Sequence, residues 1–269
     1  MGADASGYSR SRGLWGTLGY PKLKQSQYRG VELRDIADEM ELRLSKEIRN
    51  IPKVKANLLF QYKRAEFIKS HRAAEWHLWG KSYFRYDIYG EQQELLAHIA
   101  DKFGVEVLVL YAAPAVVTMD DLLSAKLGRN IIESTNFRPA VDLIGHHRNT
   151  YVDPGSFSIA CSEPERFAPF SLLRELRNLD GFSFENPARF FIEFAQGVRE
   201  VLVSDTLFGD YFLREAERYN DAGVSLDSLY FSMVSMSIFR ELTGVQWVVA
   251  TAQNEQRLSS NKNVFPNRY

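Results

Sequence analysis

The chain has 269 residues, of which 45% are apolar and 25% charged, with a formal net charge of −1. This composition is that of an ordinary globular protein, and no apolar run reaches the roughly 18 residues of a membrane helix. The single cysteine, Cys161, excludes an internal disulfide framework and a four-cysteine metal site, and residues 1–8 lack the apolar region of a signal peptide. We therefore expect a cytoplasmic protein with no membrane partner.

The charges are unevenly distributed. Residues 1–72 hold 15 Lys and Arg against 8 Asp and Glu, whereas the remainder holds 18 against 26. A basic first part favours a polyanionic partner at that end. Attraction between the two parts, or basic residues that solvate loops, explains the asymmetry equally well.

The first half of the chain predicts an α/β arrangement. We expect a flexible N-terminus over residues 1–20, followed by a helix at 21–36 and a strand at 37–44. A basic connector at 45–56 then leads to a buried strand at 57–63. Beyond these, the patterns predict helices at 65–79, 91–103 and 119–127, strands at 83–89, 105–111 and 131–134, and a hairpin of 147–152 with 157–162.

The second half is mainly helical. Asn186 followed by Pro187 is typical of a helix start, and further helices are expected at 207–219 and 225–242 before a closing strand at 245–252. We therefore predict a central mixed β-sheet flanked by helices in an α/β domain over 21–165, a helical region packed on it over 166–252, and a loose tail over 253–269. The helical region is a candidate surface for a homo-oligomer or a protein partner.

The polar residues of two predicted strands suggest a site. Side chains alternate along a strand, so Gln61 and Lys63 share one face, and Glu39 and Glu41 share the polar face of residues 37–44. A buried lysine requires an anionic neighbour, and the two polar faces meet if the strands are adjacent. Carboxylate and amide oxygens suit Mg²⁺ or Mn²⁺, and a lysine stabilises charge on a phosphate.

This reasoning gives a predicted set of site residues. Glu39, Glu41 and Gln61 are the candidate metal ligands, Glu32 is a further candidate ligand, and Lys63 is the catalytic cation. Lys46, Arg49, Lys53 and Lys55 of the basic connector either follow a phosphate backbone or form a solvated loop.

The order of these elements resembles the core of the PD-(D/E)XK nuclease superfamily. The similarity covers roughly residues 25–112 and includes Glu39 and Glu41, then Gln61-Tyr62-Lys63, then a helix with Gln92 and Gln93. It implies a restriction-endonuclease-like fold, Mg²⁺ dependence and a DNA or RNA substrate. In it, Glu39 or Glu41 would take the acidic position, Gln61 the second acidic position and Lys63 that of the lysine. The superfamily association extends to bacterial antiviral defence and DNA processing.

Other interpretations remain open at this stage. Lys63 and Glu41 could form a cross-strand salt bridge that holds an ordinary sheet. The chain could also be a non-catalytic binding or scaffold module that keeps the nuclease-like sheet without its metal. Cys161 lies opposite Arg148 and near His147 in the predicted hairpin, which permits a thiol-dependent hydrolase.

Overall fold

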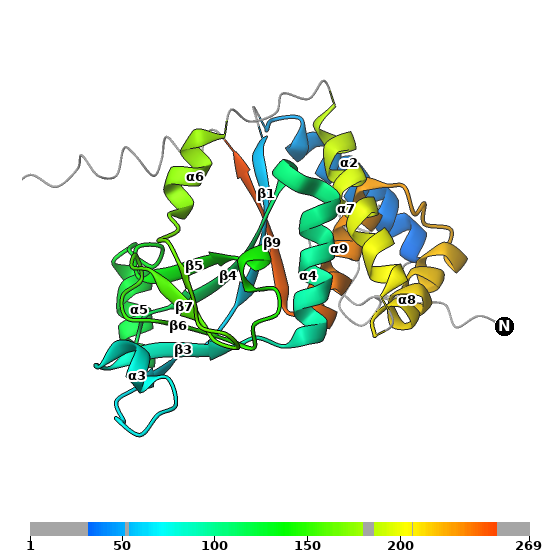
Figure 1. The fold of residues 1–269 in the computed structure, drawn as a ribbon. Coiled ribbons are helices and arrows are strands. Elements are labelled where there is room, and N and C mark those ends of the chain that lie inside the picture. Colours follow the sequence, from blue (N-terminus) through cyan, green and yellow to red (C-terminus); the bar gives the residue numbers. More distant parts are fainter. Residues whose placement is uncertain (1–31, 52–53, 180–185, 206, 252–269) are drawn as a thin grey trace, which may run out of the picture. The chain divides into compact units, whose positions relative to one another are not determined.

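The computed structural model describes residues 32–51, 54–179, 186–205 and 207–251. Its chain divides into two compact units (Figure 1). The helical unit comprises residues 1–52 and 183–242, and the sheet unit comprises residues 53–182 and 243–269. The first helical segment is thus grouped with the later helices, and the last strand with the sheets, so this division differs from the predicted boundary near residue 165.

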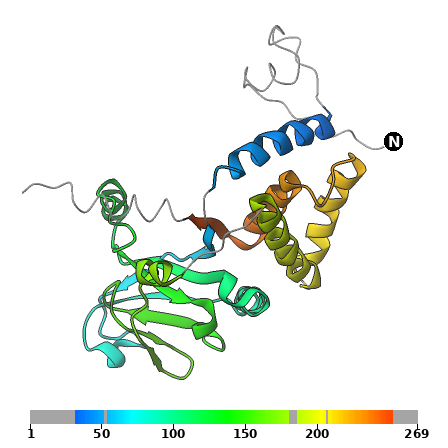
Figure 2. The same ribbon diagram turned by 90° about the horizontal axis from the view of Figure 1, so that it is seen from above.

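The helical unit contains four helices in the part of the chain that the structure describes. They are α2 (Leu33–Ile48), α7 (Pro187–Ser204), α8 (Gly209–Asp221) and α9 (Leu229–Thr243), whose last residue is counted with the sheet unit. Asn186 caps α7 as predicted, because its Oδ1 accepts a hydrogen bond from the backbone N–H of Ala188 at 3.1 Å. Helix α7 lies beside both α2 and α8 (Figure 2).

The predicted strand at residues 37–44 is wrong, because this segment is the middle of α2. The buried or half-buried residues of α2 are Leu33, Ile36, Ala37, Glu39, Met40, Glu41, Leu44, Ser45 and Ile48, and most of them recur at the three- to four-residue spacing of a helix. Leu42, which the strand pattern placed on an apolar face, is 69% exposed. Glu, Met, Leu, Arg and Lys are strong helix formers, and here their propensity prevails over an eight-residue alternation. Most of the helix predicted at 21–36 lies outside the described residues.

The sheet unit contains a four-stranded mixed sheet of order β5-β4-β1-β9. Its strands are β1 (Val54–Tyr62), β4 (Val107–Pro114), β5 (Thr135–Pro139) and β9 (Val245–Thr251). Strand β1 pairs with β4 in parallel and with β9 antiparallel, and β5 pairs antiparallel with β4. The predicted mixed sheet flanked by helices is therefore confirmed at this level.

A second, five-stranded antiparallel sheet has the order β2-β3-β6-β7-β8. It is built from β2 (Glu66–Ile68), β3 (Tyr83–Asp87), β6 (Arg148–Tyr151), β7 (Ser158–Ala160) and β8 (Glu165–Phe167). The β6–β7 hairpin was predicted. The helix predicted at 65–79 is wrong, because this segment holds β2 and only the short α3 (Trp76–Trp79). The strand predicted at 131–134 lies instead at β5, four residues later.

The helices of the sheet unit are α3, α4 (Gly90–Phe103), α5 (Met119–Leu127) and α6 (Leu172–Asn178), with 3-10 turns at η2 (Gly104–Glu106) and η3 (Ala140–Leu143). Helix α4 packs against β4 (Figure 1). It buries Leu95, Leu96 and Ile99. Since α4 follows β3 and precedes β4, it brings its N-terminal residues to the end of the parallel β1–β4 pair.

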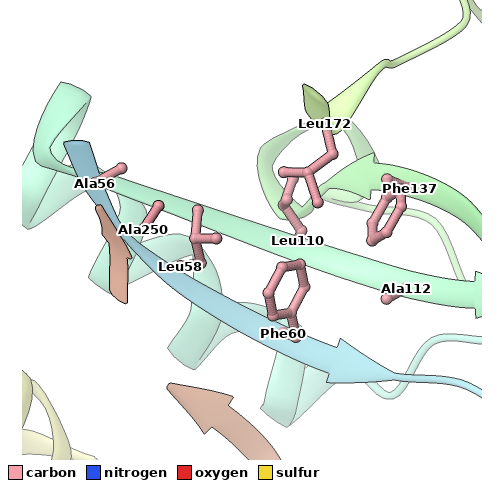
Figure 3. Close-up of a cluster of buried hydrophobic side chains, with 8 residues drawn as sticks. All are labelled: Ala56, Leu58, Phe60, Leu110, Ala112, Phe137, Leu172 and Ala250. Carbon is pink, nitrogen blue, oxygen red and sulfur yellow. The ribbon is translucent and has the colours of Figure 1, made fainter. Parts of the chain in front are cut away.

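One face of the four-stranded sheet carries an apolar cluster, and the opposite face carries Gln61. Leu58 and Phe60 of β1 pack with Leu110, Phe137 and Leu172 in a cluster of buried side chains that also contains Ala56, Ala112 and Ala250 (Figure 3). By strand alternation, Leu59 and Gln61 point to the opposite face. The apolar cluster fixes the register of β1, and the register places Gln61 on the side of α4.

Among the described residues, none of the helices is both long enough and apolar enough to span a bilayer.

Candidate functional site

The candidate site lies at the C-terminal end of β1 in the sheet unit. Gln61 is only 8% exposed, and Lys63 follows one residue beyond the strand. The backbone N–H of Lys63 donates to the carbonyl of Ala112 at 3.0 Å, which continues the pairing with β4. The predicted shared face of Gln61 and Lys63 is supported by their common partner, Gln92.

The side chain of Gln92, near the start of α4, joins three groups. Its Nε2 donates to Gln61 Oε1 at 2.7 Å and to the carbonyl of Thr243 at 2.6 Å, and its Oε1 accepts from Lys63 Nζ at 3.2 Å. Both acceptors lie at the nitrogen end of the amide and the donor at its oxygen end. This pattern assigns the amide orientation and connects β1, α4 and Thr243 within the sheet unit.

Two aromatic rings surround the Lys63 ammonium. Nζ lies 4.7 Å from the ring centre of Tyr89 and 5.4 Å from that of Tyr111. Tyr111 is fully buried and donates to Gln93 Oε1 at 2.5 Å, whereas Tyr89 is 68% exposed. Both rings present a π-face to a cation, which stabilises the ammonium without neutralising it.

Partial burial lowers the pKa of Lys63 to about 8, and the negative charge of Asp87 opposes this shift. Removal from water disfavours the charged form of an amine, and a nearby carboxylate favours it. At pH 7 the side chain is mostly protonated and poorly hydrated. The ammonium therefore titrates just above neutral pH.

The predicted acidic residues lie in the helical unit. Glu39 pairs with Arg43, with Oε1 to Nε at 2.6 Å, in an i,i+4 pair on α2. Glu41 Oε2 accepts from the backbone N–H of Tyr230 at 2.7 Å, in the first turn of α9, where amide groups lack helical partners. Glu32 is exposed and precedes the first residue of α2. Glu39 and Glu41 therefore belong to α2, and Glu32 to its N-cap position, not to a strand paired with β1.

Two side-chain oxygens near Lys63 that could ligate a metal ion also accept hydrogen bonds within the sheet unit. Gln61 Oε1 accepts from Gln92, and the carboxylate of Asp87 accepts from Arg148 Nε at 2.7 Å. No group of three or more metal-ligating His, Cys, Asp or Glu side chains occurs among residues with described positions.

The basic connector is divided between the two units. Lys46 and Arg49 are exposed at the end of α2, and Lys53 lies outside the described residues. Lys55 is partly buried in β1, and its Nζ donates to the carbonyl of Leu176 at 3.1 Å. Its ammonium therefore has a structural contact with the end of α6.

A buried ion-pair cluster was missed by the sequence analysis. Glu75 is 6% exposed and accepts from Arg148 Nη1 at 2.6 Å, Tyr83 Oη at 2.9 Å and Arg85 Nη1 at 3.4 Å. Despite its burial, these hydrogen bonds hold the pKa of Glu75 at about 2. The helix predicted at 65–79 concealed this role, because it gave Glu75 no relation to the strands.

Cys161 does not have the surroundings of a catalytic thiol. It is buried, and burial raises its pKa, which disfavours the nucleophilic thiolate. Its backbone N–H pairs with the carbonyl of Arg148 as the hairpin predicted, but the ring of His147 contacts Ser162 Oγ at 2.8 Å. The geometry thus gives no support to a thiol-dependent hydrolase.

In comparisons with known proteins, no family model, curated protein or solved structure matches this chain.

Proposed function

We propose that the sheet unit binds nucleic acid through a phosphate contact at Lys63, and that this contact serves phosphodiester hydrolysis. The observation that carries the proposal is the partly buried Lys63 ammonium, which is held by an amide and two aromatic rings and has no hydrogen-bonded carboxylate among its described partners. A lysine with a structural role is usually exposed to water or paired with a carboxylate. A partly buried lysine without a carboxylate partner can still bind an anionic ligand.

The chemistry of this proposal requires a cation at a fixed position. Gln92 accepts one of the three ammonium protons of Lys63, so two remain for phosphate oxygens. Gln61 and Gln92 hold each other, which restricts the ammonium to the end of β1. Preorganised positive charge stabilises the negative charge that develops on a transferring phosphate.

A non-catalytic nucleic-acid-binding module is the second candidate. It is favoured by one observation: Glu39 and Glu41, the predicted metal ligands, are bonded to Arg43 and to the start of α9. A nuclease-like lysine site without available carboxylates could bind phosphate and leave the bond intact.

The test combines binding and cleavage. Labelled DNA and RNA, single-stranded and duplex, are incubated with Mg²⁺, with Mn²⁺ and with EDTA, for the wild type, Lys63→Ala and Lys63→Arg. Lys81→Ala is the control, because Lys81 is an exposed cation of the same unit. We expect Lys63→Ala to lose binding and cleavage, and Lys81→Ala to retain both. Binding without cleavage under all three conditions would select the second candidate, and binding unaffected by Lys63→Ala would contradict both.

A further inference from the structure

Tyr89 is an exposed aromatic ring directly beside the Lys63 ammonium. Its neighbour Ile88 is 5% exposed, and the N–H of Ile88 donates to the carbonyl of His147 at 2.8 Å, so the backbone is anchored before α4 begins. Tyr89 itself is 68% exposed although its ring lies 4.7 Å from Nζ. A large ring that stands in solvent on a fixed backbone is available to a ligand.

The two rings around Lys63 differ in their exposure to solvent, and therefore in whether a ligand can reach them. Tyr111 is fully buried and bonded to Gln93, so its ring is part of the core. Tyr89 occupies the N-cap position of α4, and its side chain makes no capping hydrogen bond. Its backbone carbonyl accepts from the N–H of Gln93 at 2.9 Å, whereas the contact described for its ring is the one with the ammonium.

We propose that Tyr89 is a base-stacking residue, and that the Lys63 site accepts single-stranded nucleic acid. This inference rests on the function proposed above. One sugar separates each phosphate from its base, so a phosphate at Lys63 brings an adjoining base to the Tyr89 ring. Every base has a π-face, which makes such stacking tolerant of sequence. In a duplex those faces are covered by neighbouring base pairs, so an unpaired strand is the substrate that can use the ring.

The test compares strands with and without bases. Fluorescence anisotropy measures the affinity of a labelled single-stranded DNA, a single-stranded RNA, the corresponding duplex, and an abasic phosphodiester strand of equal length. The variants are Tyr89→Leu, which removes the ring, and Tyr89→Phe, which keeps it. Tyr211→Leu is the matched control, because Tyr211 is also exposed and has the guanidinium of Arg214 6.0 Å from its ring.

We expect the wild type to bind single strands more tightly than the duplex. Tyr89→Leu should weaken binding of base-bearing single strands by about 5- to 150-fold, the range for loss of one base stack. It should leave the abasic strand unaffected, and Tyr89→Phe and Tyr211→Leu should retain wild-type affinity for all strands.

Two outcomes would overturn the inference while leaving the proposed function intact. An equal loss of affinity for abasic and base-bearing strands would show that Tyr89 acts only by positioning Lys63. Equal affinity of the wild type for single strand and duplex would contradict the inferred preference for single-stranded nucleic acid. In contrast, the proposed function itself would be overturned if the wild type bound none of the strands, or if Lys63→Ala bound them as tightly as the wild type.

Discussion

Lys63 and Gln92 meet at 3.2 Å between Nζ and Oε1, across the end of β1 and the beginning of α4. The nitrogen of the same amide is bound to Gln61 and to the Thr243 carbonyl. One neutral side chain therefore holds the ammonium and two oxygen acceptors, so its removal is expected to affect the site and the fold together.

Replacement of Gln92 with leucine should destabilise the protein by about 1–3 kcal/mol, because Gln61 Oε1 and the Thr243 carbonyl lose a donor in a partly buried position. Urea unfolding measures this change. Gln196→Leu is the control, since Gln196 bonds the exposed Asp227, and its effect should stay below about 0.5 kcal/mol. Equal values for the two variants would refute a central role of Gln92.

Phosphate binding should weaken as the pH rises through about 8, the lowered pKa of Lys63. Above this pH the lysine loses the charge that attracts the anion. The affinity for a labelled oligonucleotide is measured from pH 6.5 to about 9.5, a window that brackets this pKa. Lys63→Arg should abolish this dependence while it keeps the charge, because a guanidinium does not titrate there. A pH dependence that persists in Lys63→Arg would assign it to another group.

The lowered pKa of Lys63 also affects stability. Between pH about 8 and 10.5 the unfolded state binds the lysine proton more strongly than the folded state, so the contribution of Lys63 to the free energy of unfolding increases with pH. Comparison of the wild type with Lys63→Met in urea across this window isolates the contribution. A decrease with pH would contradict the lowered pKa.

Two substitutions can distinguish a structural role of Glu41 at the start of α9 from a role in catalysis. Its carboxylate accepts from the Tyr230 N–H at the start of α9. Glu41→Ala should cost about 1 kcal/mol, as loss of a capping acceptor does, and Glu41→Gln, which retains an acceptor oxygen, should cost less. Thermal and urea unfolding of both variants test this expectation. If Glu41→Gln leaves stability unchanged but abolishes nucleic-acid cleavage, Glu41 acts in catalysis in addition to its contact with α9.

Glu75→Gln should destabilise the protein by about 2–3 kcal/mol. In this variant Arg148 keeps its ion pair with Asp87, and Arg85 keeps its ion pair with Glu66. The loss of stability therefore lies at or below the lower end of the range for breaking a buried ion pair. Glu66→Gln is the control, since the side chain of Glu66 is 65% exposed and its loss should cost less than about 1 kcal/mol.

The Glu75 contribution has a defined pH dependence. The pKa of Glu75 is lowered from 4.5 to about 2, so its stabilisation is present above pH 4.5 and is lost as the pH falls towards 2. The difference in unfolding free energy between the wild type and Glu75→Gln should therefore narrow across that interval. A constant difference would show that the Glu75 carboxylate is not held in its charged form by the arginines.

Several elements could be predicted from the sequence because their signals are local. The apolar run of β1, the α4 pattern ending at Gly104, and the Asn186-Pro187 helix start each depend on side-chain periodicity or backbone geometry within a few residues. The shared face of Gln61 and Lys63 follows from strand alternation alone. These features needed no knowledge of distant partners.

Partner choice was decided only by the tertiary structure. The alternation at residues 37–44 fits a strand, but helix propensity and burial of Ala37 and Ile48 make it a helix, so its acids cap and pair within the helical unit. Gln92 meets Lys63 although 29 positions separate them, and its amide also bonds the carbonyl of Thr243, two residues before β9. Sequence patterns specify which face of an element is polar, whereas long-range packing determines which other element that face meets.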